Sequence, residues 1–168
     1  MDSVTIAVRQ WAEQKPEWNT LPMSIIDRAL RITKRIELAM AKFYQQIGLT
    51  PGEFEVLLAL RRAGAPYCLT PAMLQSLTLL SSGAMTHRLD LLEQKGWLVR
   101  TMSQTDRRSI DVTLSEQGVC RIEPLLLEYW AWQAYILRGF SELEQDALSN
   151  QLQQWLSHYE QRWNGDFQ

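Results

Sequence analysis

The 168-residue sequence predicts a mainly α-helical fold with a small β wing, on three observations. Apolar residues recur at helical spacing through most of the chain. A helix that begins with Ser81 and Ser82 ends at Gly96. Segments 97–102 and 109–114 then alternate as strands, joined by the polar segment 103–108. A helix followed by a hairpin with a basic tip is typical of a winged helix-turn-helix, here with further helices at the N- and C-terminal ends.

Length and composition favour a single domain with no membrane segment. With 46% apolar residues, 168 residues can bury one core but leave no room for a large catalytic domain beside it. No run of about 18 apolar residues occurs, and Asp2 and Arg9 interrupt the N-terminal apolar positions. We therefore expect a soluble, cytoplasmic protein.

The reactive residues do not form an enzyme or metal signature. Cys68 and Cys120 are far apart and belong to no ligand pattern, and His87 and His158 are the only histidines. No catalytic triad spacing and no glycine-rich phosphate loop is visible. The sequence predicts no enzyme activity, no metal and no cofactor.

Charge is distributed unevenly. The net charge of −2 argues against indiscriminate nucleic-acid binding. Basic residues nevertheless gather around the helix and wing, whereas acidic residues gather near the C-terminus. The basic group is Arg88, Lys95, Arg100, Arg107 and Arg108, and the acidic group is Glu142, Glu144, Asp146 and Glu160. A basic face on an acidic body suits a specific binder, particularly one that presents this face twice in a dimer.

Three helices are expected in the N-terminal half. Apolar residues at helical spacing predict a short helix over 4–14, which ends before Pro16, and a longer one that ends near Gly48. The longer helix has an apolar stripe made of Ile25, Ala29, Ile32, Ile36, Ala39, Met40 and Phe43. Thr50 and Glu53 form a capping box for a third helix, which reaches Gly64, is apolar nearly all round and should be central.

The next two helices have helix-turn-helix spacing. Thr70 and Pro71 start a short helix over 72–77, and Ser81 or Ser82 caps the next one. Its inward stripe is Met85, Leu89 and Leu92, which leaves Gly83, Thr86, His87 and Asp90 on the other face. Ser115 opens a long helix after the wing, and Ser141 and Glu144 cap the last helix.

The predicted DNA-facing residues are Ser81, Ser82, Gly83, Thr86 and His87. Small residues at a helix start let the backbone approach base edges and phosphates in a major groove. Capping alone would explain at least one of the two serines, but no structural role explains Thr86 and His87.

The wing adds Arg107 and Arg108 to the predicted DNA contacts. Asp106 could hold one arginine in an ion pair, while the other, expected to be Arg107, enters a minor groove. The alternative is a solvated turn whose charges maintain solubility.

The order of these elements resembles the MarR family of transcriptional regulators, over nearly the whole chain. The resemblance is carried in order by residues 48–58, 80–89, 92–96, 106–108 and 112–118. It implies a homodimer that binds a palindromic DNA operator, with repression relieved by a small-molecule effector. It also implies dimer and ligand-pocket helices in 1–47, a DNA-binding lobe in 48–114 and dimerisation helices in 115–168.

Within the family, the chain is most similar to the branch that responds to urate and related purines. That branch has an extra N-terminal helix with a tryptophan, and its ligand site maps here onto Trp11, Glu55, Arg88 and Arg100. Glu55 stands where that branch usually has Asp. Its side chain is longer by one methylene group, a departure that bears on the identity of the ligand.

The residues give this pocket a physical basis. Arg88 lies on the shoulder of the inward stripe, where a guanidinium needs a partner, and Glu55 is a candidate. An anionic ligand that competes for Arg88 would then move the recognition helix. Alternatively, Arg88 reaches a phosphate, Glu55 pairs with Arg62, and Trp11 only anchors its helix. Two alternative functions remain open: a regulator of the same family that responds to phenolic compounds, and a winged-helix module that binds protein.

Overall fold

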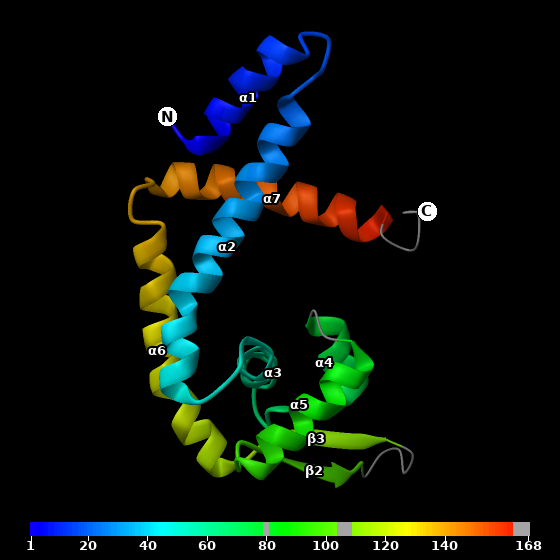
Figure 1. Ribbon diagram of the computed structural model, residues 1–168. Coiled ribbons are helices and arrows are strands. Elements are labelled where there is room, and N and C mark those ends of the chain that lie inside the picture. Colours follow the sequence, from blue (N-terminus) through cyan, green and yellow to red (C-terminus); the bar gives the residue numbers. More distant parts are fainter. Residues whose placement is uncertain (79–80, 104–108, 163–168) are drawn as a thin grey trace.

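The computed structural model describes residues 1–78, 81–103 and 109–162 (Figure 1). Seven helices and three strands lie within these ranges. They are α1 Ser3–Gln14, α2 Leu21–Ile47, α3 Pro51–Arg62, β1 Cys68–Leu69, α4 Pro71–Leu77, α5 Ser82–Gln94, β2 Leu98–Met102, β3 Ile110–Leu114, α6 Glu116–Ile136 and α7 Glu142–Arg162. The predicted fold class, mainly helical with a small β wing, is confirmed.

The molecule consists of a compact lobe and a set of long helices that extend away from it (Figure 1). The lobe contains α3, α4, α5 and the small sheet. Helices α2 and α6 rise from it, α1 folds back beside the N-terminal part of α2, and α7 lies far from the sheet. The helix-turn-helix is therefore held at one end of the molecule and α1 at the other.

Side-chain caps fix where the helices begin. Ser81, Thr70 and Ser115 each accept a hydrogen bond from the backbone N–H three residues ahead. Both predicted capping boxes are formed: Thr50 N–H donates to Glu53 Oε2 at 2.6 Å, and Ser141 N–H donates to Glu144 Oε2 at 2.8 Å. These local signals are why the predicted helix starts agree with the structure to within a residue or two.

The sheet has one strand more than predicted. Its order is β1-β3-β2, with both neighbouring pairs antiparallel. β1 has only two residues, Cys68 and Leu69, which is too short for an alternating pattern to be detectable. β2 begins at Leu98, one residue later than expected. Trp97 is buried and bonds to the end of α5 instead, because its N–H donates to Leu92 O at 2.9 Å.

The core lies around α3, as predicted. Phe54, Val56, Leu57, Ala59 and Leu60 are at most 1% exposed, so this helix is enclosed on nearly every side. The inward stripe of α5, most of the buried sheet residues and Ile122 of α6 pack into the same cluster. Helices α4 and α5 are thus seated on a rigid support.

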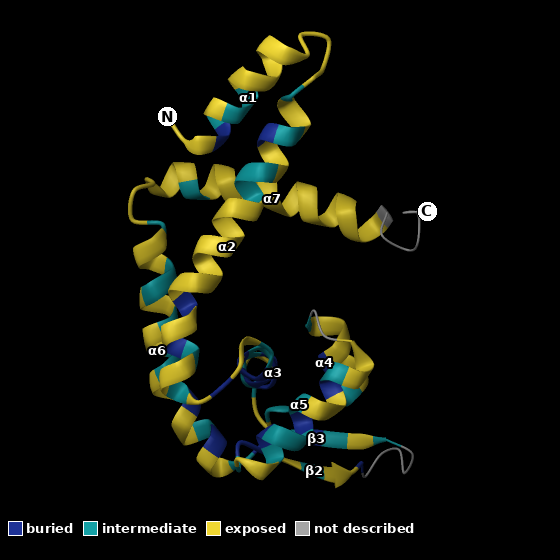
Figure 2. Cartoon of the chain, in the orientation of Figure 1, coloured by how far each residue is buried: buried dark blue, intermediate teal, exposed yellow. Residues whose placement is uncertain are grey.

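The long helices are mostly exposed beyond this core (Figure 2). On α2, the predicted stripe is buried only at Met40 and Phe43, whereas Ile25 and Ile32 are about half exposed. Helix α7 has no buried residue among those whose burial is described. Apolar side chains of the two helices line an open groove of about 480 Å³, formed by Ile26, Ala29, Leu30, Leu152, Trp155, Leu156 and Tyr159.

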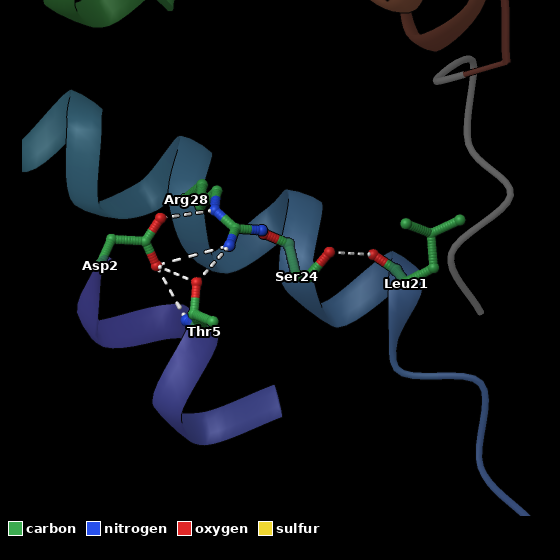
Figure 3. Close-up of polar contacts among 5 residues, drawn as sticks. All are labelled: Asp2, Thr5, Leu21, Ser24 and Arg28. Carbon is green, nitrogen blue, oxygen red and sulfur yellow. Dashed lines mark hydrogen bonds and ion pairs between the residues drawn. The ribbon is translucent and has the colours of Figure 1, made fainter. Parts of the chain in front are cut away.

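A polar contact fastens α1 to α2 (Figure 3). Arg28 Nε donates to Asp2 Oδ2 at 3.0 Å, and Arg28 Nη2 donates to Thr5 Oγ1 at 3.1 Å. Asp2 also caps α1 by accepting from Thr5 N–H at 2.8 Å. The hydrogen bonds from Arg28 and then from the Thr5 backbone hold the pKa of the Asp2 carboxyl well below its usual range.

Within the described ranges, no helix is both long and apolar enough to cross a membrane.

Candidate nucleic-acid interface

Helix α5 presents one face to the core and the other to solvent. Its inward stripe of Met85, Leu89 and Leu92 is at most 2% exposed. The five predicted DNA-facing residues of this helix are all exposed: Ser81, Ser82, Gly83, Thr86 and His87. The structure therefore places them together on one accessible surface at the N-terminal end of α5.

The hydroxyl groups on this surface already have local roles. Ser81 Oγ accepts from Ala84 N–H at 3.4 Å, and Thr86 Oγ1 donates to Ser82 O at 3.2 Å. Each oxygen keeps a lone pair that can accept from a ligand. An open helix N-terminus with exposed Gly83 also favours the approach of a phosphate.

The root of the wing is fastened to α5 by Arg100 of β2. Arg100 Nη2 lies 2.7 Å from Asp90 Oδ1 and 2.6 Å from Glu93 Oε2, and Arg100 N–H donates to Glu93 Oε1 at 2.9 Å. Hydrogen bonds from the Arg100 side chain lower the pKa of Glu93, despite the opposing effect of burial. Asp90 was expected on the DNA-facing side, but it faces the wing. The predicted wing residues Asp106, Arg107 and Arg108 lie outside the described residues.

The predicted ion pair between Glu55 and Arg88 does not form. Arg88 Nε is buried and has no hydrogen-bond partner among the described residues. Glu55 is half-buried and contributes to raising the pKa of Tyr44, after burial of the phenol and the influence of Tyr129. Glu55 thus lies near an aromatic cluster rather than against Arg88. Arg62, the alternative partner, donates to Leu77 O instead.

The other two predicted ligand residues lie apart from this pair. Trp11 is 42% exposed on α1 and stacks on Trp18 with ring centroids 5.4 Å apart. Helix α1 packs on α2, at the opposite end of the molecule from α5 and β2 (Figure 1). Among the described residues, no hydrogen bond, ion pair or ring contact joins any two of Trp11, Glu55, Arg88 and Arg100.

Two ionic contacts of this lobe are not apparent from the sequence. Lys95 Nζ donates to the buried Glu53 at 2.6 Å, and Arg100 binds Asp90 and Glu93. Glu53 and Lys95 are 42 residues apart, so no local pattern links them. Within the described ranges, no group of three or more His, Cys, Asp or Glu residues could hold a metal ion.

Comparison with known proteins agrees with this geometry. A model of the MarR family matches residues 47–109. The HTH-type transcriptional regulator PecS of Dickeya dadantii is 34% identical over 145 residues, which cover 86% of this chain and 87% of PecS. The HTH-type transcriptional repressor MdtR of Bacillus subtilis is 30% identical over 123 residues, which cover 73% of this chain and 77% of the repressor.

Solved structures share the fold at lower identity. AbsC, a MarR family transcriptional regulator from Streptomyces coelicolor, superimposes with a TM-score of 0.78 at 19% identity, covering 87% of this chain and 99% of AbsC. A mutant of MarR from E. coli complexed with operator DNA gives a TM-score of 0.68 at 23% identity, covering 87% of this chain and 97% of the mutant. The named relatives are transcriptional regulators, not enzymes. By its extended similarity to PecS and its match to the family model, this chain belongs to the MarR family of transcriptional regulators.

Proposed function

We propose that this chain is a cytoplasmic, homodimeric transcriptional repressor that binds a palindromic DNA operator and is released by a small anionic aromatic or purine ligand such as urate. In this proposal, residues 48–114 bind DNA, 1–47 contribute to the dimer and the ligand pocket, and 115–168 complete the dimer. The observation that carries it is the exposed polar face of α5 on a rigid apolar support.

The groove-reading role of α5 is supported by its side-chain arrangement. Ser81, Ser82, Gly83, Thr86 and His87 lie on the exposed side of a helix whose opposite side is anchored in the core. A helix so mounted can enter a major groove without losing its packing. Arg107 and Arg108 at the tip of the wing would add contacts in the neighbouring minor groove, where a narrow groove attracts guanidinium groups.

The homodimer is supported by the apolar surface that one chain leaves uncovered. The groove between α2 and α7 is lined almost wholly by apolar side chains, and Trp130 and Leu127 of α6 are also more than half exposed. Contiguous apolar surface of this kind marks a protein interface. A two-fold dimer would present α5 and the wing twice, as two half-sites of a palindrome require.

The effector site is proposed to centre on Arg88. Its buried Nε has no partner among the described residues, and an unsatisfied buried donor costs about 1–3 kcal/mol until a ligand or phosphate accepts from it. By resemblance to the urate-responsive branch, we place Glu55, Arg100 and Trp11 in the same site. Since Trp11 lies at the opposite end of one chain from Arg88, this assignment requires the second subunit of the proposed dimer to bring a Trp11 to the site. A ligand anion bound to Arg88 would act directly on the recognition helix, because Arg88 belongs to α5.

A mobility-shift titration tests the function. The probe is the intergenic DNA upstream of the protein's own gene, with and without urate, xanthine and salicylate. Specific binding released by a purine supports the whole proposal, whereas release by salicylate alone moves the effector to the phenolic class. If the protein does not bind this DNA specifically at low salt, the proposal that this DNA contains its operator is contradicted. Weak dependence of the interaction on salt would favour a protein-binding module.

Arg107→Ala supplies the matched test of the wing. If Arg107 makes a specific groove contact, its loss weakens operator binding by about 1–3 kcal/mol and leaves the dimer intact. Unchanged affinity would remove Arg107 from the interface.

A further inference from the structure

A single ammonium group connects three helix ends in the DNA-binding lobe. Lys95 is the C-cap of α5, and its Nζ donates to Glu53 Oε1 at 2.6 Å and to Gly48 O at 3.0 Å. Gly48 is the C-cap of α2, and Glu53 belongs to the first turn of α3. The end of the recognition helix is therefore tied to the junction between α2 and α3.

The Glu53 carboxylate at the centre of this contact is fully buried, and both of its oxygens accept hydrogen bonds. The Glu53 side chain is 0% exposed, and its other oxygen accepts from Thr50 N–H at 2.6 Å. Burial alone would raise the pKa of Glu53, but hydrogen bonds from Lys95 and Thr50 outweigh it and hold the pKa below its usual range. Since a buried charge without a partner is costly, Glu53 requires the ammonium group of Lys95.

Lys95 is held from its backbone side as well. Arg121 of α6 donates from Nη1 to Lys95 O at 3.2 Å, and its guanidinium lies 3.7 Å from the centroid of the Trp97 ring. Ser115 Oγ, at the start of α6, donates to Gly96 O at 2.7 Å. The exit of α5 is thus fixed to α6 by its backbone and to the α2–α3 junction by the Lys95 side chain.

The orientation of α5 is set by the packing of its inward stripe in the core together with the contact at its C-terminal end. The exposed residues proposed to contact DNA lie at the N-terminal end of α5, and the Lys95 contact lies at its C-terminal end. Residues 82–94 span about 20 Å at 1.5 Å per residue, so a small rotation at Lys95 becomes a large displacement at Ser82.

We propose that Lys95, acting through Glu53 and Gly48, is a positioning residue that fixes the recognition helix relative to α2 and thereby sets the spacing of half-sites that the dimer accepts. This inference rests on the proposed function, because it requires a dimer that binds two half-sites. Loss of the Lys95 contact should leave each lobe able to bind a half-site but make the dimer tolerant of altered spacing.

The main variant is the double substitution Glu53→Gln with Lys95→Met. Glutamine retains the capping box, and methionine leaves no uncompensated charge opposite it. Lys42→Met is the control, because Lys42 is an exposed lysine of α2 that makes no hydrogen bond or ion pair with a described residue. Lys95→Arg keeps the cation and should retain wild-type behaviour.

The experiment begins with the wild-type dimer and a pool of random DNA duplexes, from which the preferred palindromic site is selected. Affinity is then measured for this site and for versions with one base pair inserted or deleted at its centre, which rotates one half-site by about 35°. The readout is the ratio of the affinities for native and altered spacing. A general loss of stability lowers all three affinities and does not change the ratio.

We expect the ratio to fall about three- to tenfold in the double variant, which lies in the lower part of the range for coupled neighbours. It should stay at the wild-type value in Lys42→Met and Lys95→Arg. An unchanged ratio in the folded double variant, with the wild type discriminating, overturns only this inference. If the wild type enriches no palindromic site, the proposed function is overturned and the inference with it. If the double variant does not fold, Glu53→Gln alone carries the same comparison.

Discussion

Truncation of Leu156 tests whether the apolar groove between α2 and α7 is a subunit interface. Leu156 lines this groove and is 58% exposed in one chain. Full burial of a leucine contributes about 1.5–3 kcal/mol, so covering the exposed part contributes about 0.9–1.7 kcal/mol. A two-fold interface uses each residue twice, so Leu156→Ala should cost the dimer about 2–3.5 kcal/mol.

This cost corresponds to a rise in the dimer dissociation constant of about 30- to 300-fold. Sedimentation velocity over a range of protein concentrations measures the constant directly. Gln154→Ala is the matched control, because two residues along a helix place Gln154 on nearly the opposite side of α7 from Leu156. A wild-type protein that stays monomeric at micromolar concentration would show that the groove is not a subunit interface. So would a folded Leu156→Ala variant whose constant changes by less than about threefold.

Three further predictions concern the DNA-binding lobe and its attachments. His87→Ala should weaken operator binding by about 1–3 kcal/mol in a mobility-shift assay, with unchanged circular dichroism, and unchanged affinity would exclude a base contact. Arg88→Ala should retain operator binding but lose release by the effector; a normal response would place the pocket elsewhere. Asp2→Asn should free α1 from Arg28 and expose it to protease. Because the folded pKa of Asp2 is depressed, the wild-type contact is fully present above the ordinary carboxyl pKa near 4 and is lost as the pH falls further. A protease sensitivity of the wild type that does not change with pH would contradict this role of the Asp2–Arg28 contact.

The sequence was sufficient for the elements that depend on short-range signals. Side-chain caps at Thr50, Ser115 and Ser141 mark helix starts, because each hydroxyl satisfies a backbone N–H only three residues away. The inward stripe of α5 follows from helical periodicity and is buried as predicted. The complementary face of α5 was therefore also predictable, including the exposure of Thr86 and His87.

The residues of the predicted effector pocket do not meet as local sequence signals suggest. The sequence suggested that Arg88 needs a partner and offered Glu55. Among the described residues, however, Arg88 Nε has no hydrogen-bond partner, and Glu55 lies near Tyr44. Which charged groups meet depends on the distances between helices, and periodicity along one helix does not encode those distances. The same limit applies to β1, whose two residues become a strand only because β3 pairs with them.

Local signals along the chain were enough to predict the order of the helices, their caps, the face that α5 turns to the core and the strands that follow it. These properties arise from interactions within about four residues, so they can be recognised along the chain. Which distant charges pair depends on how the helices pack in three dimensions, since Lys95 meets Glu53 across 42 residues. The fold also sets how much of the apolar stripe of α2 one chain can bury: of that stripe only Met40 and Phe43 are buried in the core, and the part of the helix before them extends beyond it.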